Sequence, residues 1–381
     1  MRGAVVVIGL LFGLLSGSPW AASQEPAARP AAPADVEGVE LFEIESKLLT
    51  EFWGRPMTIQ AGVVLPPGHD ASKRDTPVCY SIHGFGGSHR EAWRHGARLR
   101  TDMKEREYPK LLYVFLNAQF SMGHHEFADS VNNGPWGKAL TMEFIPQLEA
   151  KYGAAATPES RFLTGHSSGG WSSLWLQVNY PEYFGGVWST APDSVDFRDF
   201  TGVDVYSFEN AYVDPQGAEI PLVRKGDKWV MMLKTYAQQE YAKSDHGGQF
   251  ASFDAVFSPR AEDGRPMKLF DRETGKIDRE TAEAWRKYDI SLILKNDWER
   301  LRPLLQSKLH IYMGTLDTYR LEGAVKLMKA DLDSLQSDAE ILLVEGRDHG
   351  TLFRPHPELW PEGMLPHIHN AMRASWDRHR P

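Results

Sequence analysis

A serine in the setting of a nucleophile lies in the segment 161–170, Arg-Phe-Leu-Thr-Gly-His-Ser-Ser-Gly-Gly. Gly165 and Gly169 each stand two residues from Ser167, the spacing of a nucleophile elbow between a strand and a helix. Glycine suits such a turn because it has no Cβ to collide with nearby backbone. The turn would hold the Ser167 hydroxyl clear of the main chain, where the helix start directs backbone N–H groups at an attacked carbonyl. A motif this short also arises by chance, so its surroundings must supply the rest of the chemistry.

A serine hydroxyl attacks well only with a base within hydrogen-bond reach and a carboxylate that orients the base. Asp317 follows the apolar run 309–313, and His349 follows the apolar run 341–344. Both therefore come after a predicted strand, in the chain order nucleophile, acid, histidine that accompanies this elbow. The sequence predicts a catalytic triad of Ser167, Asp317 and His349.

Other residues compete for two of these roles. Asp348 is a rival acid, but as the immediate neighbour of His349 it cannot easily reach the far side of that ring. Asp317 could also cap the helix that follows it, and capping does not exclude catalysis. Rival bases are found toward the C-terminus, where a solvated or half-buried histidine is ordinary: His356, His367, His369 and His379.

A glycine-rich loop, His-Gly-Phe-Gly-Gly at 83–87, follows another apolar run directly. Its glycines allow the backbone to approach a substrate and to direct N–H groups at it. We expect the backbone N–H groups of Phe85 and Ser168 to form an oxyanion hole, with Gly84 or Gly86 as alternative first donors.

The segment after the predicted strand 111–116 should border the mouth of the site. It carries residue types that bind metals, namely His124, His125, Glu126 and Asp129. Their spacing matches neither a His-Glu-x-x-His helix nor a Cys/His framework, so we expect no metal there. Residues 132–136 are expected to shape the floor of the site, and Trp136 and His166 are the predicted substrate contacts.

Periodicity predicts the elements that position these residues. Residues 42–48 and 57–65 alternate apolar with polar and predict two antiparallel strands. Short apolar runs then alternate with helical patterns: strands at 78–82, 111–116, 161–164, 186–190, 309–313 and 341–344, and helices at 91–107, 139–152, 321–335 and 365–379. Strands without a polar face predict a mostly parallel sheet covered by helices on both faces, which binds ligands at the carboxyl ends of its strands. Pro146 should kink its helix.

The stretch between the predicted strands 186–190 and 309–313 is too long for an ordinary crossover connection. We therefore predict a cap-like insertion at about 196–295, with a helix over 280–288. Its aromatic residues could line an acyl or sugar pocket, although most should form the insertion's own core: Phe197, Phe200, Tyr206, Trp229, Phe250, Phe253 and Phe257.

The N-terminus has the pattern of a secretory signal peptide over 1–23: a basic residue, an apolar run too short to span a bilayer, and small residues before the expected cleavage site. An uncleaved N-terminal anchor is the alternative. Residues 24–36 are rich in Pro and Ala and predict a linker, which leaves 37–381 as one catalytic domain. We expect a secreted or periplasmic protein without stable membrane insertion after cleavage.

Net charge and cysteine content limit the classes of partner and the covalent cross-links that the chain can form. The net charge of −9 disfavours nucleic acid. Cys79 is the only cysteine of the chain, which excludes an intramolecular disulfide, and its place within a predicted strand indicates a small buried apolar residue.

The motifs at 83–87 and 165–170, with Gly-Thr-Leu-Asp at 314–317 and Gly-Arg-Asp-His-Gly at 346–350, resemble the α/β-hydrolase superfamily. They are most similar to the "putative esterase" group, which includes esterase D, feruloyl esterases, enterochelin esterases and mycolyltransferases. The resemblance covers about 40–195 and 300–355. It implies the α/β-hydrolase fold, the same triad and oxyanion donors, and no cofactor.

These observations favour an exported serine hydrolase that cleaves a carboxylic ester, in a small molecule or linked to a polymer, through an acyl-enzyme. An acyltransferase that passes the acyl group to a sugar or lipid alcohol is an alternative, which the mycolyltransferase relatives suggest. A serine peptidase and a non-catalytic binding module on the same scaffold are further alternatives. The sequence does not indicate an oligomeric state.

Overall fold

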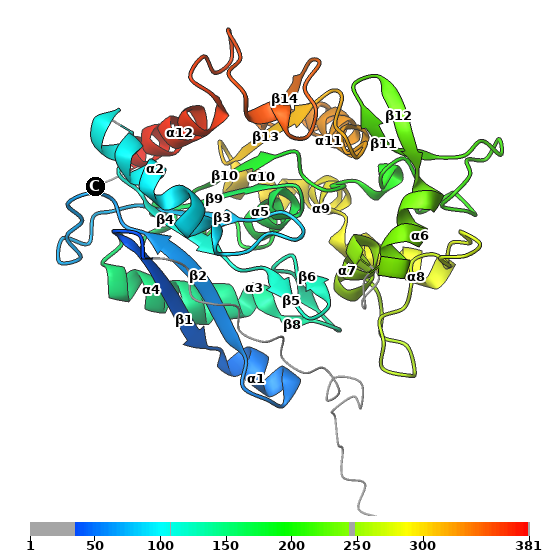
Figure 1. The fold of residues 1–381 in the computed structure, drawn as a ribbon, viewed down its shortest axis with the longest axis horizontal. Helices are drawn as coiled ribbons and strands as arrows, with labels where there is room; N and C mark the ends of the chain where they lie inside the picture. The colour runs from blue at the N-terminus through cyan, green and yellow to red at the C-terminus, as the bar shows by residue number, and fades with distance from the viewer. Residues whose placement is uncertain (1–34, 107, 244–247, 380–381) are drawn as a thin grey trace, which may run out of the picture.

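A central eight-stranded sheet organises the computed structural model, which describes residues 35–106, 108–243 and 248–379 (Figure 1). Its strands, in spatial order, are β1 (Val39–Glu45), β2 (Thr58–Val64), β4 (Leu112–Leu116), β3 (Val78–Ile82), β9 (Arg161–His166), β10 (Gly186–Thr190), β13 (Leu309–Gly314) and β14 (Glu340–Val344). β2 pairs antiparallel with both β1 and β4, and all strands from β4 to β14 are parallel. The predicted mostly parallel sheet with antiparallel N-terminal strands is confirmed. The predicted signal peptide and residues 24–34 of the predicted linker lie outside the described residues.

The inner strands lack a polar face because both of their faces are covered. Every residue of β4 and β10 is buried. One face is covered by α2 (Glu91–Glu105) and α12 (Met364–His379), and the Tyr113 hydroxyl lies 3.3 Å from His369 Nε2 of α12. On the other face, Tyr80 donates a hydrogen bond of 3.1 Å to Glu149 of α4 (Ile145–Tyr152).

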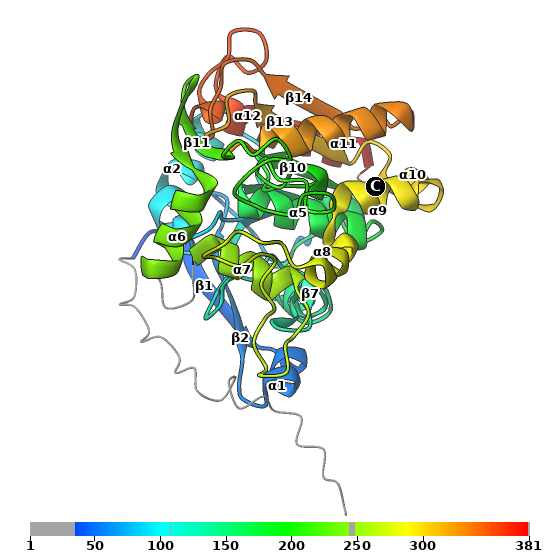
Figure 2. The same cartoon turned by 90° about the vertical axis from the view of Figure 1, so that its right-hand side faces the viewer.

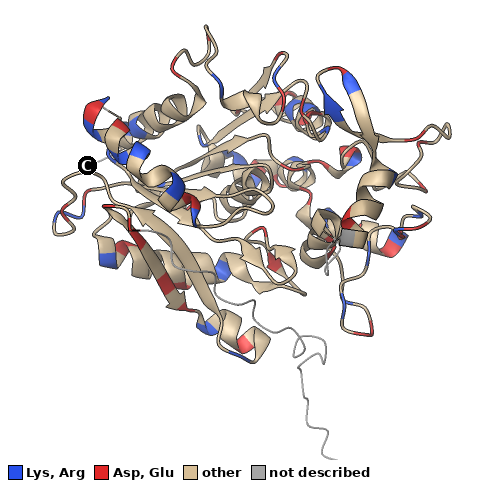
Figure 3. Cartoon of the chain, in the orientation of Figure 1, with Lys and Arg blue, Asp and Glu red and all other residues tan. Residues whose placement is uncertain are grey.

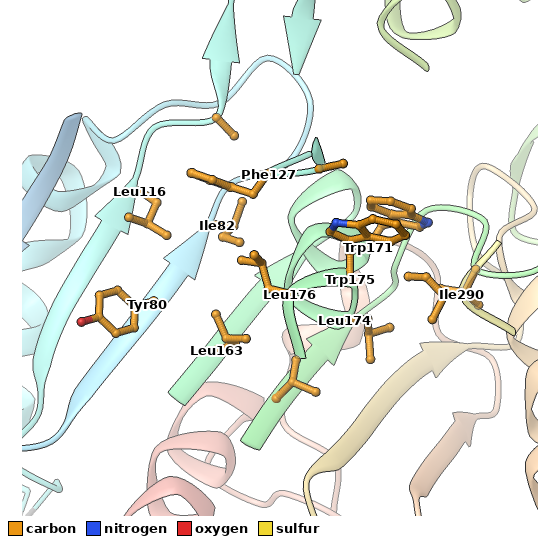
Figure 4. Packing of buried hydrophobic residues seen from close by; sticks show 14 of the residues in the cluster. Tyr80, Ile82, Leu116, Phe127, Leu163, Trp171, Leu174, Trp175, Leu176 and Ile290 are labelled. Atoms are coloured by element: carbon orange, nitrogen blue, oxygen red, sulfur yellow. The ribbon is translucent and has the colours of Figure 1, made fainter. Parts of the chain in front are cut away.

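The helix that follows Ser167, α5 (Ser168–Asn179), is buried along nearly its whole length. Trp171, Leu174 and Trp175 lie among apolar side chains of the sheet and of later segments (Figure 4). This packing places the start of α5 firmly at the carboxyl ends of β9 and β10.

Two predicted elements differ in detail. Strand β1 ends at Glu45, because the Ser46 hydroxyl accepts a hydrogen bond of 3.2 Å from the Leu49 backbone and so caps α1 (Lys47–Trp53). The predicted helix over 139–152 is divided into α3 (Trp136–Ala139), a π-helical turn at Leu140–Phe144, and α4. Pro146 lies just after this π-helical turn, so its missing N–H falls where the regular α-helical hydrogen-bond pattern is already interrupted.

Between β10 and β13 the residues that the structure describes form a hairpin, β11 (Pro221–Lys225) and β12 (Lys228–Met232), and five helices. These are α6 (Leu233–Lys243), α7 (Gly248–Phe257), α8 (Arg279–Trp285), α9 (Ile290–Asn296) and α10 (Trp298–Leu305). The helix predicted over 280–288 is present as α8, which a 3-10 turn at Arg286–Tyr288 follows. Figure 2 shows α6 and α7 stacked outside the sheet, and α11 (Glu322–Ser334) then connects β13 to β14.

Four short strands lie between β4 and α3. They form two small hairpins, β5 (Gln119–Phe120) with β6 (Gly123–His124) and β7 (Asp129–Ser130) with β8 (Gly134–Pro135). Charged residues are concentrated on the outer helices and loops and are sparse on the central strands (Figure 3). Within the described ranges, the helices all fall short of the length and apolar character needed to cross a bilayer.

Candidate active site

Ser167 occupies a strained turn between β9 and α5. Its backbone has φ 60° and ψ −125°, a left-handed conformation that few side chains adopt. A Cβ at Gly165 would overlap the carbonyl of Gly169, and a Cβ at Gly169 would overlap the carbonyl of Ile82. The two flanking glycines are therefore required by close backbone packing, and this packing holds the elbow in shape.

The structure brings Asp317 and His349 together. Asp317 follows β13 and is fully buried, and His349 lies in the loop after β14, with its Nδ1 2.7 Å from Asp317 Oδ2. The second carboxylate oxygen accepts a hydrogen bond of 2.9 Å from the Tyr319 backbone, which orients the carboxylate. Asp348 instead accepts hydrogen bonds from the backbone of Gly350 and Thr351 and belongs to its own turn.

The surroundings of His349 favour its protonated form. Burial of the imidazole lowers its pKa, but the hydrogen bond to Asp317 and the charges of Asp317, Asp193 and Asp348 outweigh burial. The pKa of His349 is therefore raised above its ordinary value. Since Nδ1 faces Asp317, the Nε2 atom is the one left for proton transfer.

Ser167 and His349 line the same cavity, which has a volume of about 300 Å³. The Ser167 hydroxyl donates to Asp193 Oδ1 at 3.3 Å, and no hydrogen bond joins Ser167 to His349 within the part of the chain that the structure describes. Ser167 and His349 thus share one cavity, and Asp317 lies buried behind His349, to which it is hydrogen-bonded.

Asp193 is the main residue that sequence reasoning missed. It lies three residues after β10, and its Oδ2 accepts hydrogen bonds from Ser168 Oγ at 2.6 Å and Gln249 Nε2 at 3.1 Å. Burial and the nearby carboxyl of Glu126 raise its pKa to about 6. A signal was available, because Asp193 follows a parallel strand in the way that Asp317 does.

The loop 83–87 lies against the nucleophile. A Cβ at Gly84 would stand 3.2 Å from the Ser167 Cβ, and Phe85 lines the cavity with 38% of its surface exposed. Ser168, the other expected oxyanion donor, is the first residue of α5 and is buried. The His83 ring accepts a hydrogen bond of 2.9 Å from the Ala118 backbone, which anchors the loop to the segment after β4.

The two predicted substrate contacts differ in position. His166 lines the cavity, and its ring centroid lies 4.3 Å from that of His349. Trp136 instead stacks on His125 with ring centroids 3.7 Å apart and donates a hydrogen bond of 2.8 Å to the Asn133 carbonyl. It is buried and is not among the residues that line the cavity, because its indole fills the interior beneath α3. That Trp136 contacts substrate stays a prediction, and in this structure the indole packs on His125 outside the cavity lining.

The segment 124–126, which follows β4, is hydrogen-bonded to the loop 83–87 and to α5. His124 Nε2 lies 2.9 Å from the His83 carbonyl, and Glu126 accepts a hydrogen bond of 2.5 Å from Ser172 of α5. In the described ranges, no group of three or more His, Cys, Asp or Glu has an arrangement that could hold a metal ion.

Aromatic residues of the segment between β10 and β13 divide between the cavity and a core. Phe200, Phe250 and Phe253 line the cavity, together with Tyr236. Others pack away from it: the Phe197 and Phe257 rings both contact Trp285. The segment therefore supplies one apolar wall of the cavity.

Solved structures share this architecture. A ferulic acid esterase aligns with a TM-score of 0.54 and 13% identity over 88% of this chain and 98% of its own. An S-formylglutathione hydrolase from Agrobacterium tumefaciens aligns with 0.51 and 14%, over 90% and 97% of the two chains. The fluorophosphonate-binding serine hydrolase F of Staphylococcus aureus aligns with 0.52 and 11%, over 89% and 98%. At these identities the likeness establishes the α/β-hydrolase fold.

Sequence comparison identifies the family. No curated protein matches the chain, but a family model described as "Putative esterase" matches residues 51–321. That match spans most of the chain and includes the elbow, the loop 83–87 and Asp317. The protein therefore belongs to this esterase family and is a serine hydrolase of the α/β-hydrolase fold that acts on ester bonds.

Proposed function

We propose that the protein is an exported carboxylic ester hydrolase that works through an acyl-enzyme, with Ser167 as nucleophile, His349 as base and Asp317 as the orienting acid. One observation carries this proposal: the strained elbow serine lines a cavity of about 300 Å³ together with His349, whose Nδ1 is held by the buried Asp317. A serine on a strained turn, a histidine in the same cavity and a buried carboxylate behind that histidine are the parts that nucleophilic acyl transfer needs.

The reaction follows from these positions. The Ser167 hydroxyl turns from Asp193 toward His349, gives its proton to Nε2 and attacks the ester carbonyl. The tetrahedral oxyanion accepts hydrogen bonds from the backbone N–H groups of Phe85 and Ser168. His349 then protonates the departing alcohol, and water repeats the sequence on the acyl-enzyme. Asp317 keeps the Nδ1 proton in place and stabilises the imidazolium. The cycle uses only groups of the protein, its substrate and water.

Export and domain organisation complete the proposal. Residues 1–23 would be removed as a signal peptide and 24–36 would act as a linker, which releases a secreted or periplasmic enzyme. Residues 37–381 would form one catalytic domain, with 196–295 as a cap-like insertion whose Phe200, Phe250 and Phe253 form an apolar wall. Sequencing the N-terminus of the protein recovered from the exported fraction tests this part.

The central experiment compares the wild type with Ser167→Ala on nitrophenyl acyl esters, acetylated sugars and feruloyl esters. We expect the wild type to hydrolyse members of this panel and the variant to lose the activity. The variant should also resist labelling by a fluorophosphonate that labels the wild type. Equal turnover by both proteins would reject the mechanism.

A further inference from the structure

Asp193 presents a carboxylate to the catalytic cavity. Its side chain lines the cavity, although only 4% of the residue is exposed. Its backbone N–H donates to the Ser167 carbonyl at 3.1 Å, which ties this residue to the elbow. The carboxylate therefore stands beside the atom that attacks the substrate.

The two oxygens of this carboxylate differ in their partners. Oδ2 accepts two hydrogen bonds, from Ser168 at 2.6 Å and from Gln249 at 3.1 Å. Oδ1 accepts from the Ser167 hydroxyl at 3.3 Å, which is long for a hydrogen bond between a hydroxyl and a carboxylate. A carboxylate can accept about four hydrogen bonds, so Oδ1 has unused capacity.

Catalysis removes the hydrogen bond that Oδ1 accepts from the Ser167 hydroxyl. When the hydroxyl turns toward His349, Oδ1 loses its hydrogen bond while it remains out of bulk water. A buried carboxylate oxygen without a donor is unfavourable, so a substrate group that donates to Oδ1 would be bound favourably.

Among the described residues that line the cavity, none is Lys or Arg, and the basic side chains are His166 and His349. Burial lowers the pKa of His166 to about 3, so its ring is neutral at neutral pH. His349 is hydrogen-bonded to Asp317, and its charge compensates that of Asp193 only in part. Two other acidic groups lie close: Asp317 is engaged by His349, and burial raises the pKa of Glu126 well above its ordinary value. The negative charge that faces the substrate is thus mainly that of Asp193.

We propose that Asp193 determines substrate specificity: its Oδ1 accepts a hydrogen bond from a hydroxyl or ammonium group on the acyl carbon next to the scissile carbonyl, or from a hydroxyl on the second carbon of the alcohol. This inference rests on the proposed esterase function and names its substrate class. The 3.3 Å between Oδ1 and the Ser167 hydroxyl limits the donor to the immediate neighbourhood of the reacting carbonyl. Preferred substrates are therefore 2-hydroxyacyl or 2-aminoacyl esters, or esters of polyols, and a carboxylate at the same carbon is rejected.

The ionisation of Asp193 suits this role at neutral pH. Its pKa of about 6 leaves most of the carboxylate charged there, in spite of its burial. An anionic acyl group would meet this charge in a water-poor cavity, where repulsion is weakly screened.

The test uses ethyl esters that differ at one position. Ethyl butyrate is compared with its 2-hydroxy and 2-amino derivatives and with the monoethyl ester of ethylmalonic acid, which carries a carboxylate at that carbon. 1-Butyrylglycerol and propyl butyrate form the matched pair on the alcohol side. Activity is read as kcat/KM near neutral pH. We expect the wild type to favour a donor-bearing ester over its apolar counterpart by at least about tenfold and to disfavour the carboxylate. Comparison of the acyl-side series with the alcohol-side pair shows which side of the ester carries the donor.

Two variants tie this preference to Asp193. Asp193→Asn removes the charge at constant shape and should abolish the advantage of the ammonium ester and admit the carboxylate. Gln249→Lys, at a half-buried position, supplies an internal ammonium beside Asp193 and should have the same effect while the carboxylate remains. The ratios of kcat/KM between substrates are compared, because either substitution can also alter the absolute rate.

Failure of the inference can be told from failure of the proposed function. Ser167-dependent hydrolysis of the whole series without a donor preference, or with a preference that both variants retain, overturns the role of Asp193 and leaves the esterase mechanism standing. Hydrolysis that is unaffected by Ser167→Ala overturns the mechanism itself.

Discussion

The hydroxyl of Ser167 donates its hydrogen bond to Asp193 and not to His349. In this arrangement the nucleophile rests on a carboxylate from the end of β10, while the Asp317–His349 pair is already formed at 2.7 Å. Attack therefore requires the Ser167 hydroxyl to leave Asp193 and turn toward His349.

Replacing the nucleophile should abolish ester hydrolysis. In Ser167→Ala we expect kcat to fall by about 10⁴-fold or more, since the remaining groups cannot form an acyl-enzyme. Steady-state hydrolysis of a nitrophenyl ester measures the loss. The melting temperature is expected to change little, because alanine removes a single long hydrogen bond to Asp193 and leaves the elbow glycines in place. A collapse of stability would mean that the loss of activity reflects unfolding.

Removing the charge of the orienting acid should also reduce kcat severely. Asp317→Asn is expected to reduce kcat by about 10⁴-fold, because the amide favours the wrong tautomer of His349. The matched control is Asp348→Asn, whose carboxylate bonds to the backbone of its own turn, and it should keep kcat within about tenfold of the wild type. The reverse order of effects would transfer the acid role to Asp348.

The pH dependence of kcat/KM should report His349. The base must be neutral to accept the Ser167 proton, and the Asp317 hydrogen bond and nearby negative charges raise its pKa above the ordinary value despite burial. Activity should therefore fall as the pH decreases, with an apparent pKa above that of a free histidine.

Asp193→Asn provides the check on this assignment. The charge of Asp193 contributes to the raised pKa of His349, so its removal should move the acid limb toward lower pH. A limb that stays in place, or moves toward higher pH, would assign the titration to another group.

The elbow glycines should be intolerant of a side chain. In Gly169→Ala the new Cβ would overlap the Ile82 carbonyl, and relief requires backbone movement at the nucleophile. We expect a loss of about 3 kcal/mol in the free energy of unfolding, measured by denaturant titration. Gly217→Ala is the control: it has nothing within 4 Å of the added Cβ, and its positive φ alone should cost about 1 kcal/mol. A loss in Gly169→Ala no larger than that of the control would show that close packing does not make Gly169 necessary.

The fold and part of the site could be predicted from local patterns. Apolar runs without a polar face identify the buried parallel strands, and the positions of Asp317 and His349 after two of them bring both residues to one edge of the sheet. Elements set by single side chains were harder to predict. The Ser46 cap ends β1 and begins α1, and the π-helical turn before Pro146 replaces a simple kink.

The sequence by itself determined the parallel sheet, the strained turn at Ser167 and the acid and histidine that follow later strands, because residue spacing along a strand or turn fixes these features locally. Only the tertiary structure decided which way side chains point and what meets them across the chain. It turned Trp136 into the interior, and it brought Asp193, 26 residues after the nucleophile, and Gln249 of α7 to the same cavity. Such contacts depend on how separate helices pack against the sheet, and no local pattern carries that information.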